Sequence, residues 1–392
     1  MNILEEIQNC SVEWKELGEV CSVKKGKQLN KNLLTEDGSY PAYNGGQTYS
    51  GRTNDYNVEA NTIIVSQGGA SAGFVNFVDT KFWANAHCYY ILPDETRVNN
   101  RFVYHFVKMN QKFLMDFQHG AGIPALKADK LYKLLLPVPP LEIQEKIVQT
   151  LDKFTDYVTE LTSELTSRKK QYSFYRDKLL SFEDEVYQVE WKKLNECLKK
   201  GKGTKITASQ MKLLHKDGAP IRIFAGGKTY ADVNYGDIPD KDIHTEEAII
   251  VKSRGIIDFE YCTEPFSFKN EFWSYSSDNE NINLRYIYHY LVHNKEHFQN
   301  IANNMQMPQI SSNDTEKFKI PVPSLEIQSR IVQVLDNFDT VCHDLNIGLP
   351  KEIELRQKQY EYFREKLLTF TAAGVYTDST VQYSTDKTSL GS

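Results

Sequence analysis

Two stretches of the chain carry apolar seams with the spacing of a coiled coil. In residues 140–188 and again in 324–374, apolar and aromatic side chains recur at alternating intervals of three and four. A heptad pattern sustained this long predicts helices that pack on one another, although a helix packed only on its own domain is the alternative. The predicted seam positions are Ile147, Leu151, Phe154, Val158, Leu161, Leu165, Tyr172, Tyr175, Leu179 and Phe182, and Ile331, Leu335, Phe338, Cys342, Leu345, Leu349, Ile353, Tyr360, Phe363, Leu367 and Phe370.

The two seams predict rods with different details. The first runs from Leu141 to Phe182 after a double proline, which gives a helix roughly 60 Å long at about 1.5 Å per residue. The second has four extra residues and contains Gly348-Leu349-Pro350, which predicts a kink or an interruption.

A short repeat lies inside the first rod. Glu-Leu-Thr-Ser occurs twice in succession within Thr159–Ser167. One more such unit would lengthen the rod by about 6 Å, or between one and two base pairs of DNA at roughly 3.4 Å each. Chance similarity in a helix of simple composition is the alternative.

The segments that precede the two helical regions have a different pattern of apolar residues. Residues 1–139 and 189–323 hold short apolar bursts separated by Gly- and Asn-rich turns, which predicts β-rich globular domains. The spacing also predicts one helix within Val98–Phe117 and one around Ile287–Phe298. The predicted fold class is therefore α+β, with two globular domains at 1–139 and 189–323, helical regions at 140–188 and 324–374, and a disordered tail at 375–392.

The chain is a tandem duplication of one unit of about 180 residues. PVPPLEIQ at Pro137–Gln144 recurs as PVPSLEIQ at Pro321–Gln328, 184 positions later. The same duplication relates NNRFVYHF to NLRYIYHY, KKGK to KKGK and GGQTY to GGKTY. So long a period excludes a solenoid, which needs several short repeats, and indicates a two-fold design in one polypeptide.

Charge alone does not predict a nucleic-acid partner. The net charge is −6, but residues 12–139 hold 14 Lys and Arg against 12 Asp and Glu, and residues 189–323 hold 18 of each. The acidity thus lies mainly in the helical regions, which permits basic faces on the domains. No apolar run is long enough for a membrane span, and six scattered cysteines predict neither a disulfide framework nor a metal site. We expect a cytoplasmic protein.

No motif for catalysis is present. The chain lacks a methyltransferase cofactor loop with its Asn/Asp-Pro-Pro-aromatic motif, and it lacks the phosphate-binding loop of an ATP motor. His105 and His289 occupy equivalent helical positions, where core or partner-facing histidines are expected. We therefore predict no catalytic residue and no metal ligand.

The duplicated P-x-P-P/S-L-x-x-Q-x-x-I-V stretch, at Pro137–Val148 and Pro321–Val332, makes a resemblance specific. Over about residues 12–370 the sequence resembles the specificity subunit of a type I restriction–modification system. The resemblance implies that each domain reads one half of a bipartite, asymmetric double-stranded DNA target. It also implies that two antiparallel helices set the gap and dock two methyltransferase subunits, which restriction subunits with motor and nuclease activity join.

The resemblance further implies a chain without chemistry of its own. S-adenosylmethionine, Mg and ATP are expected only in the partner subunits. A two-headed protein-binding scaffold with no DNA sequence preference is the alternative, and a DNA selection in the presence of partners discriminates the two.

Residue types provide candidates for contact with DNA, because Lys and Arg bind phosphates while Arg, Lys, Asn and Gln read base edges. A solvated lysine cluster is the alternative for each basic residue, and Tyr49 and Tyr230 either stack or pack. The candidates are Lys24, Lys25, Lys27, Asn44, Gln47, Arg52 and Gln67 in the first domain, and Lys199, Lys200, Lys202, Lys205, Lys228, Lys252 and Arg254 in the second.

Matched polar positions on the two rods are candidates for contact with partner subunits. Packing between the helices is the alternative for the tyrosines. The positions are Arg168, Gln171, Tyr172 and Arg176, and their counterparts Arg356, Gln359, Tyr360 and Arg364.

Overall fold

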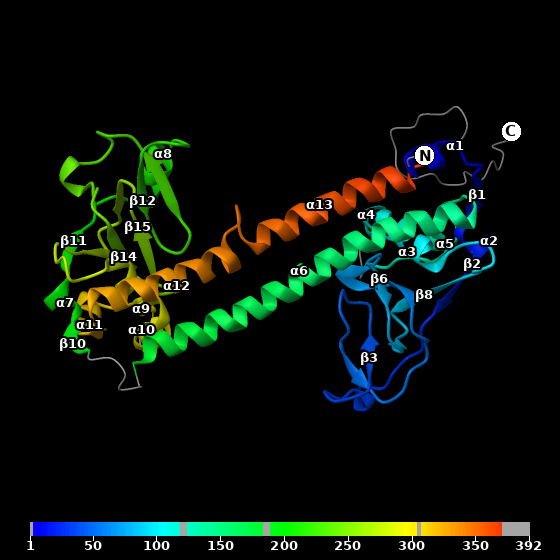
Figure 1. The fold of residues 1–392 in the computed structure, drawn as a ribbon, viewed down its shortest axis with the longest axis horizontal. Helices are drawn as coiled ribbons and strands as arrows, with labels where there is room; N and C mark the ends of the chain where they lie inside the picture. The colour runs from blue at the N-terminus through cyan, green and yellow to red at the C-terminus, as the bar shows by residue number, and fades with distance from the viewer. Residues whose placement is uncertain (1–2, 118–123, 183–188, 304–306, 371–392) are drawn as a thin grey trace. The chain divides into compact units, whose positions relative to one another are not determined.

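The computed structural model describes residues 3–117, 124–182, 189–303 and 307–370. The predicted disordered tail, residues 375–392, lies outside this part of the chain. The chain divides into two compact units (Figure 1), unit 1 with residues 1–162 and 352–392, and unit 2 with residues 163–351. Unit 1 is thus built from two separate stretches of sequence and unit 2 from one.

Unit 1 contains three small sheets. An antiparallel four-stranded sheet has the order β2-β8-β5-β6, a three-stranded sheet has the order β4-β3-β7, and β1 pairs with β9. The strands are β1 Glu13–Glu16, β2 Cys21–Lys25, β3 Tyr40–Tyr43, β4 Gly51–Thr53, β5 Thr62–Ser66, β6 Val75–Val78, β7 Trp83–Ala84, β8 Cys88–Pro93 and β9 Leu135–Val138.

Unit 2 repeats this topology, as the duplicated sequence predicts. Its sheets have the orders β11-β17-β14-β15, β13-β12-β16 and β10-β18. The strands are β10 Glu190–Lys193, β11 Lys199–Lys202, β12 Ile221–Phe224, β13 Tyr230–Val233, β14 Ala248–Lys252, β15 Asp258–Cys262, β16 Phe266–Phe268, β17 Trp273–Ser276 and β18 Lys319–Val322. Helix α8, capped by Thr207, occurs between β11 and β12, where unit 1 has only the 3-10 turn η1.

Helices complete the mixed α+β architecture, which confirms the predicted fold class. None of the helices among the described residues is long and apolar enough to cross a membrane. The helices are α1 Ile3–Asn9, α2 Leu17–Val20, α3 Asn100–Met109, α4 Gln111–Asp116, α5 Ala128–Tyr132, α6 Leu141–Ser181, α7 Leu194–Cys197, α8 Ala208–Leu214, α9 Leu284–His293, α10 Lys295–Ala302, α11 Ser312–Glu316, α12 Leu325–His343 and α13 Leu349–Leu368, with 3-10 turns η1 Lys31–Leu33, η2 Gly69–Ser71 and η3 Asp240–Asp242.

The single helix predicted within Val98–Phe117 is two helices, and so is its counterpart in unit 2. Asn110 separates α3 from α4, and its side-chain amide donates to the Phe106 carbonyl at 2.9 Å. In unit 2, Asn294 separates α9 from α10, and its side-chain amide donates to the Tyr290 carbonyl at 2.8 Å. An asparagine that bonds to the preceding turn offers the backbone an alternative to continuing the helix, which explains the break.

The long helices follow the prediction with one correction. Helix α6 is 41 residues long and ends before Phe182, whose φ of 50° is left-handed. The second helical region is interrupted between α12 and α13, as its Gly-Leu-Pro triplet predicts. A Cβ on Gly348 would lie 2.4 Å from the Thr340 carbonyl oxygen, so this turn requires glycine. Leu345 was predicted in the seam, but it lies in the interruption and is 71% exposed.

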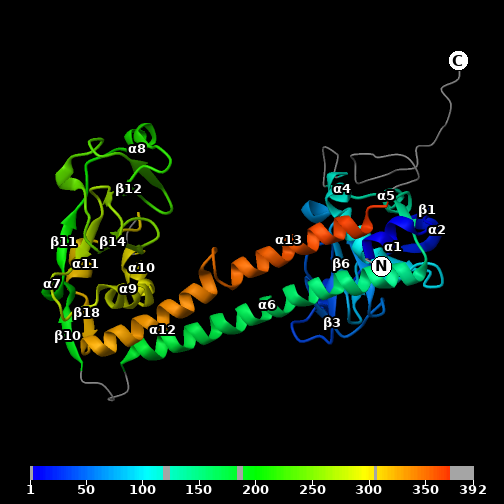
Figure 2. The same cartoon turned by 45° about the horizontal axis from the view of Figure 1, so that its top comes forward.

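Within each unit, α6 packs against a helix from the second helical region (Figures 1 and 2). In unit 1 the rings of Phe154 and Phe363 stack with centroids 5.1 Å apart. In unit 2 Phe338 of α12 lies 6.0 Å from Tyr172 and 5.8 Å from Tyr175 of α6. The predicted antiparallel pairing of helices is therefore confirmed, and a helix packed only on its own domain is wrong.

The paired helices also complete the core of each unit. In unit 1, Ile147 and Leu151 of α6 and Leu367 and Leu368 of α13 are buried in one cluster with the sheet and α3. In unit 2, Leu180 of α6 joins the corresponding cluster. Full burial of a leucine or isoleucine contributes roughly 1.5–3 kcal/mol, so these few side chains hold the helices firmly on the domains.

Candidate functional site

The repeated octapeptide ends in a glutamine that is completely buried in both units. The Gln144 side chain accepts from the backbone N–H of Asn99 at 2.7 Å. It donates to the backbone carbonyls of Pro139 at 2.7 Å and Arg97 at 3.2 Å. Gln328 makes the equivalent bonds in unit 2. Its side chain accepts from the backbone N–H of Asn283 at 2.8 Å and donates to the carbonyls of Pro323 and Asn281. The octapeptide therefore joins the start of a long helix to the segment before α3 or α9.

An ionic cluster forms a second junction in unit 1. Asp152 of α6 accepts a hydrogen bond from Nε of Arg101 at 3.1 Å and lies 2.7 Å from Nε2 of His105. The other ring nitrogen of His105 lies 3.0 Å from the Tyr360 hydroxyl of α13. One buried histidine thus connects α3 to both paired helices.

The electrostatics of this cluster assign its protons. Burial lowers the pKa of His105, so the ring is neutral, and Nε2–H donates to Asp152 while Nδ1 accepts from Tyr360. Burial raises the pKa of Tyr360 to about 12, which keeps its hydroxyl proton. Burial also acts to raise the pKa of Asp152, but hydrogen bonds from His105 and Arg101 outweigh it and bring the pKa below its ordinary value.

Unit 2 holds the same cluster at equivalent positions. Asp336 of α12 accepts from Nε of Arg285 at 3.0 Å and lies 2.7 Å from Nε2 of His289, whose pKa burial also lowers. The two histidines are therefore helix-junction residues, in agreement with a core role. Sequence reasoning passed over the arginine and the aspartate, although both recur at the 184-residue offset.

The unit 1 candidates for DNA contact lie mostly on exposed strand edges and turns. Lys24 and Lys25 are exposed on edge strand β2, and Lys27 follows it. Asn44 and Gln47 are exposed in the turn between β3 and β4.

The other two unit 1 candidates contact their own domain. Arg52 is half-buried on β4 and donates to the carbonyls of Gly38 and Ser39 at 2.5 and 3.0 Å. Gln67, directly after β5, is half-buried, and its side chain hydrogen-bonds Tyr89.

The unit 2 candidates divide into paired and exposed cations. Lys199 and Lys200 lie on β11 and form ion pairs with Asp278 and Glu316. Lys252 is only 6% exposed and lies 2.7 Å from Glu260. These three ammonium groups already have carboxylate partners inside the domain.

The remaining unit 2 candidates are all exposed. They are Lys202 on β11, Lys205 after it, Lys228 in the turn between β12 and β13, and Arg254 after β14.

The helix candidates form two matched surface groups. In unit 2, Arg168 donates to Glu164 at 2.7 Å and to Gln171 at 3.1 Å. In unit 1, Arg356 donates to Glu352 and to Gln359, both at 2.9 Å.

The tyrosines and distal arginines of the set are half-buried. Tyr172 and Tyr360 pack inside the units as described, and the Arg176 and Arg364 guanidinium groups lie over their rings at 5.7 and 5.1 Å. The two Glu–Arg–Gln groups, exposed around Arg168 and partly exposed around Arg356, are thus the accessible part of this surface.

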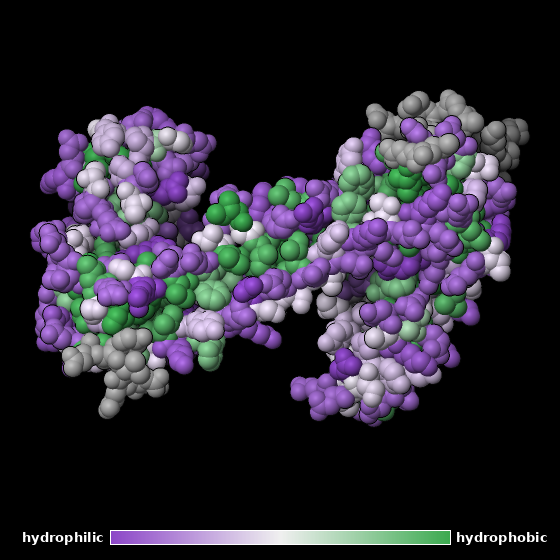
Figure 3. All heavy atoms as spheres, viewed as in Figure 1, coloured by the Kyte–Doolittle hydropathy of each residue, from purple (hydrophilic) through white to green (hydrophobic). Residues whose placement is uncertain are grey.

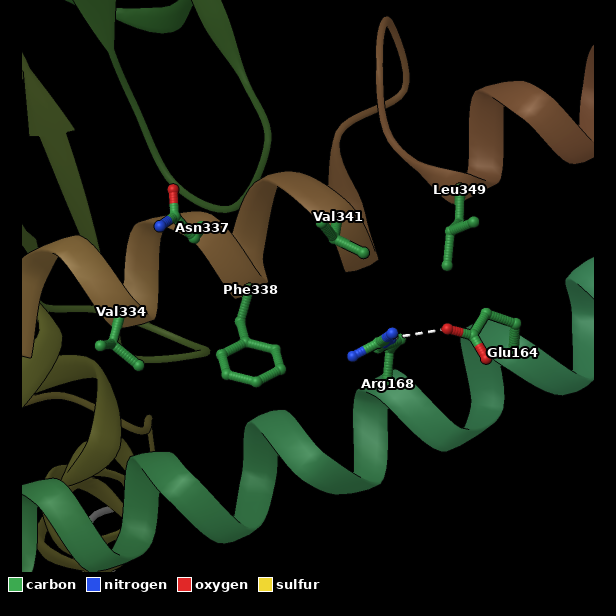
Figure 4. A pocket seen from close by; sticks show the side chains of 7 residues that line it. All are labelled: Glu164, Arg168, Val334, Asn337, Phe338, Val341 and Leu349. Carbon is green, nitrogen blue, oxygen red and sulfur yellow. Dashed lines mark hydrogen bonds and ion pairs between the residues drawn. The ribbon is translucent and has the colours of Figure 1, made fainter.

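An apolar groove of about 550 Å³ lies beside one of these groups in unit 2 (Figure 4). It opens where the helix is interrupted after α12, and Figure 3 shows apolar surface in this region. In unit 1, the positions equivalent to Val334 and Val341 are occupied by Thr150 and Tyr157. The groove is lined by Val334, Asn337, Phe338 and Val341 of α12, Leu349 of α13, and Glu164 and Arg168 of α6.

Among the described residues, no group of three or more His, Cys, Asp or Glu side chains is arranged to hold a metal ion. The junction clusters consist of an arginine, a histidine and one aspartate, whose partners are all within the protein. The two clusters therefore position α6 and α12 on their domains.

Comparison with known proteins gives the family. A type I restriction modification DNA specificity domain matches the chain twice, over residues 11–168 and 188–355. The specificity subunit of the Escherichia coli type I restriction enzymes EcoR124I and EcoR124II is 30% identical, over 94% of this chain and 97% of that protein. A putative type I restriction enzyme specificity subunit of Haemophilus influenzae is also 30% identical, over 93% and 97%.

A solved structure shares the fold. The S subunit of a type I restriction–modification system from M. genitalium aligns with a TM-score of 0.68 and 22% identity, over 93% of this chain and 98% of that one. The chain therefore belongs to the type I restriction–modification DNA specificity family.

Proposed function

We propose that this chain is a non-catalytic subunit that selects the DNA sequence on which a type I restriction–modification complex acts. One observation carries the proposal: two domains of identical strand order but different surface residues occur in one chain. Two related readers on one polypeptide suit a target of two unlike half-sites. A protein-binding scaffold is not favoured, because the chain belongs to the DNA specificity family.

The exposed cations support a surface for DNA on each domain. Lys24, Lys25 and Lys27 in unit 1 and Lys202 and Lys205 in unit 2 are accessible for phosphate contacts. Lys199, Lys200 and Lys252 already pair with acids, so their contribution to phosphate binding is smaller. Asn44, Gln47, Lys228 and Arg254 are exposed candidates for base edges.

The paired helices support docking of two methyltransferase subunits. The Glu–Arg–Gln groups around Arg168 and Arg356 are matched, as two identical partners require, and are exposed around Arg168 and partly exposed around Arg356. Restriction subunits complete the assembly, and these partners supply S-adenosylmethionine, Mg and ATP chemistry. The assembly acts on DNA in the cytoplasm.

The test is selection from a random DNA library with the full chain, alone and co-expressed with the methyltransferase subunit of its own system. We expect the complex to enrich two short motifs at one fixed separation, and the isolated chain to bind weakly. An unenriched library with the complex present would contradict the proposal. A point of comparison is the methyltransferase subunit alone, which we expect to select nothing.

A change in helix length tests the spacing role. Insertion of one more Glu-Leu-Thr-Ser unit after Ser167 adds about 6 Å to α6. We expect the selected gap to grow by one or two base pairs while both motifs stay unchanged, because the domains themselves are untouched. Substitution of Thr162 and Ser163 by alanine, which keeps the length, is the control. An unchanged gap after the insertion would exclude the helix as the spacer.

A further inference from the structure

One exposed turn is present in both domains and differs at its central residue. Gly45–Tyr49 lies between β3 and β4, and the equivalent Gly226–Tyr230 runs from the end of β12 to Tyr230, the first residue of β13. The sequences are Gly-Gly-Gln-Thr-Tyr and Gly-Gly-Lys-Thr-Tyr, so only Gln47 and Lys228 differ. Both of these side chains are exposed.

Each turn is fixed to the neighbouring four-stranded sheet at the same backbone atom. Ser66, the last residue of β5, donates to the Gly46 carbonyl at 3.0 Å. Lys252, the last residue of β14, donates to the Gly227 carbonyl at 3.2 Å. Ser66 and Lys252 are equivalent strand positions. The two domains therefore share the position of this bond but use a hydroxyl donor in one and an ammonium donor in the other.

A second strand position supports the anchor in both units. Asn76 lies opposite Ile64 in unit 1 and donates to the Gln47 carbonyl at 2.7 Å. Glu260 lies opposite the equivalent residue of β14 and binds the Lys252 ammonium at 2.7 Å. The turns are therefore held rigidly, and a rigid turn presents its central side chain at a defined place.

The last residue of each turn is an aromatic ring beside an arginine. Tyr49 is 49% exposed, and the Arg52 guanidinium lies 6.0 Å from its ring centroid. Tyr230 is 48% exposed, and the Arg222 guanidinium lies 4.1 Å from its ring. About half of each tyrosine is accessible to a ligand. Arg222 is paired with Asp232 at 2.7 Å and Arg52 donates to two backbone carbonyls, so both arginines hold the rings in place within the domain. Exposed aromatic rings are common contacts for nucleic acid.

Unit 2 adds a groove to this surface. Helix α8 and the turn enclose about 490 Å³, lined in part by Lys212, His215, Thr229 and Tyr230. A Cβ on Gly226 or Gly227 would meet no heavy atom within 4 Å, so the backbone of the turn is open to close approach. Both features suit a nucleic-acid edge.

We infer that these turns are the base-reading elements of the two domains, with Gln47 reading an adenine and Lys228 a guanine in the respective half-sites. Glutamine pairs its carboxamide with adenine N6 and N7, and lysine donates to guanine O6 and N7. This inference rests on the proposed function. It assigns one specificity-determining residue to each domain, and it makes Ser66 and Lys252 positioning residues for the turns.

The test exchanges the two residues in the full chain within its methyltransferase complex. We expect Gln47→Lys to change the preference at one base pair of the first half-site from adenine to guanine, by roughly tenfold or more. The second half-site and the gap should stay as in the wild type. Lys228→Gln should make the converse change in the second half-site only.

Gln149→Lys is the control, because it adds the same charge at an exposed position of α6 outside both turns. Unchanged motifs in both turn variants would overturn the inference and leave the proposed function intact. Weaker binding without a new base preference would also overturn it, because it would indicate a phosphate contact or a structural role. If the wild type selects no bipartite motif, the proposed function itself fails.

Discussion

Replacement of Asp152 by alanine is expected to lower the free energy of unfolding of unit 1 by about 2–4 kcal/mol. The carboxylate is the common acceptor for Arg101 and for His105, whose side chain is completely buried. Its removal leaves a half-buried guanidinium without its ion-pair partner and a buried N–H without an acceptor, and both losses are costly. Urea unfolding followed by the fluorescence of Trp14 and Trp83, in a background without the unit 2 tryptophans, measures the change.

The duplicated junction provides an internal comparison. Asp336→Ala should destabilise unit 2 in the same direction but by less, because its side chain is 37% exposed against 29% for Asp152. Glu352→Ala removes a partly exposed i,i+4 helix pair with Arg356 and should cost about 0.5 kcal/mol or less. An Asp152→Ala loss as small as that of Glu352→Ala would show that the cluster does not stabilise unit 1.

Replacement of Gln144 by methionine is expected to cost about 2–4 kcal/mol, although the two side chains are similar in size. The buried carboxamide satisfies the Asn99 amide and two carbonyls, and methionine supplies neither a strong donor nor a strong acceptor. Each buried backbone group left unpaired costs about 1–3 kcal/mol. We expect a clear fall in the urea midpoint of unit 1 and faster hydrogen exchange of the Asn99 amide.

Gln149→Met is the matched control for this experiment. The substitution is the same and the helix is the same, but Gln149 is exposed. We expect its effect to lie within about 0.5 kcal/mol of zero. Equal midpoints for the Gln144 and Gln149 variants would remove the octapeptide glutamine as the reason for the junction's stability.

Periodic features of the fold could be predicted from sequence, because periodicity is a local signal. The heptad seams predicted paired helices, and Gly348 with Pro350 predicted the interruption that separates α12 from α13. Leu345 shows the limit: its spacing continued the seam, yet the chain had already left the helix. The break at Asn110 was also not visible, because it depends on where one side-chain amide finds its carbonyl.

The chemistry of single residues could be predicted less well, because it depends on partners distant in sequence. Lys252 was a candidate for DNA contact by residue type, but Glu260 and the Gly227 carbonyl bind its ammonium inside the domain. Asp152 gave no signal by itself, since Arg101 and His105 lie about fifty positions earlier. Comparison of the two copies would have found it, because the trio recurs with the same spacing.

The division of unit 1 between the two ends of the sequence has a consequence for how the protein is made. Unit 2 is complete once residue 351 has left the ribosome, whereas unit 1 still lacks Leu367 and Leu368. Until then the core cluster that holds Ile147 and Leu151 of α6 is incomplete, and incompletely buried apolar surface is the kind of exposure that chaperones and proteases recognise. Leu367 and Leu368 therefore complete the core of unit 1 only after all of unit 2 has been synthesised, and a premature stop before Leu367 would destabilise the domain formed by the N-terminal residues.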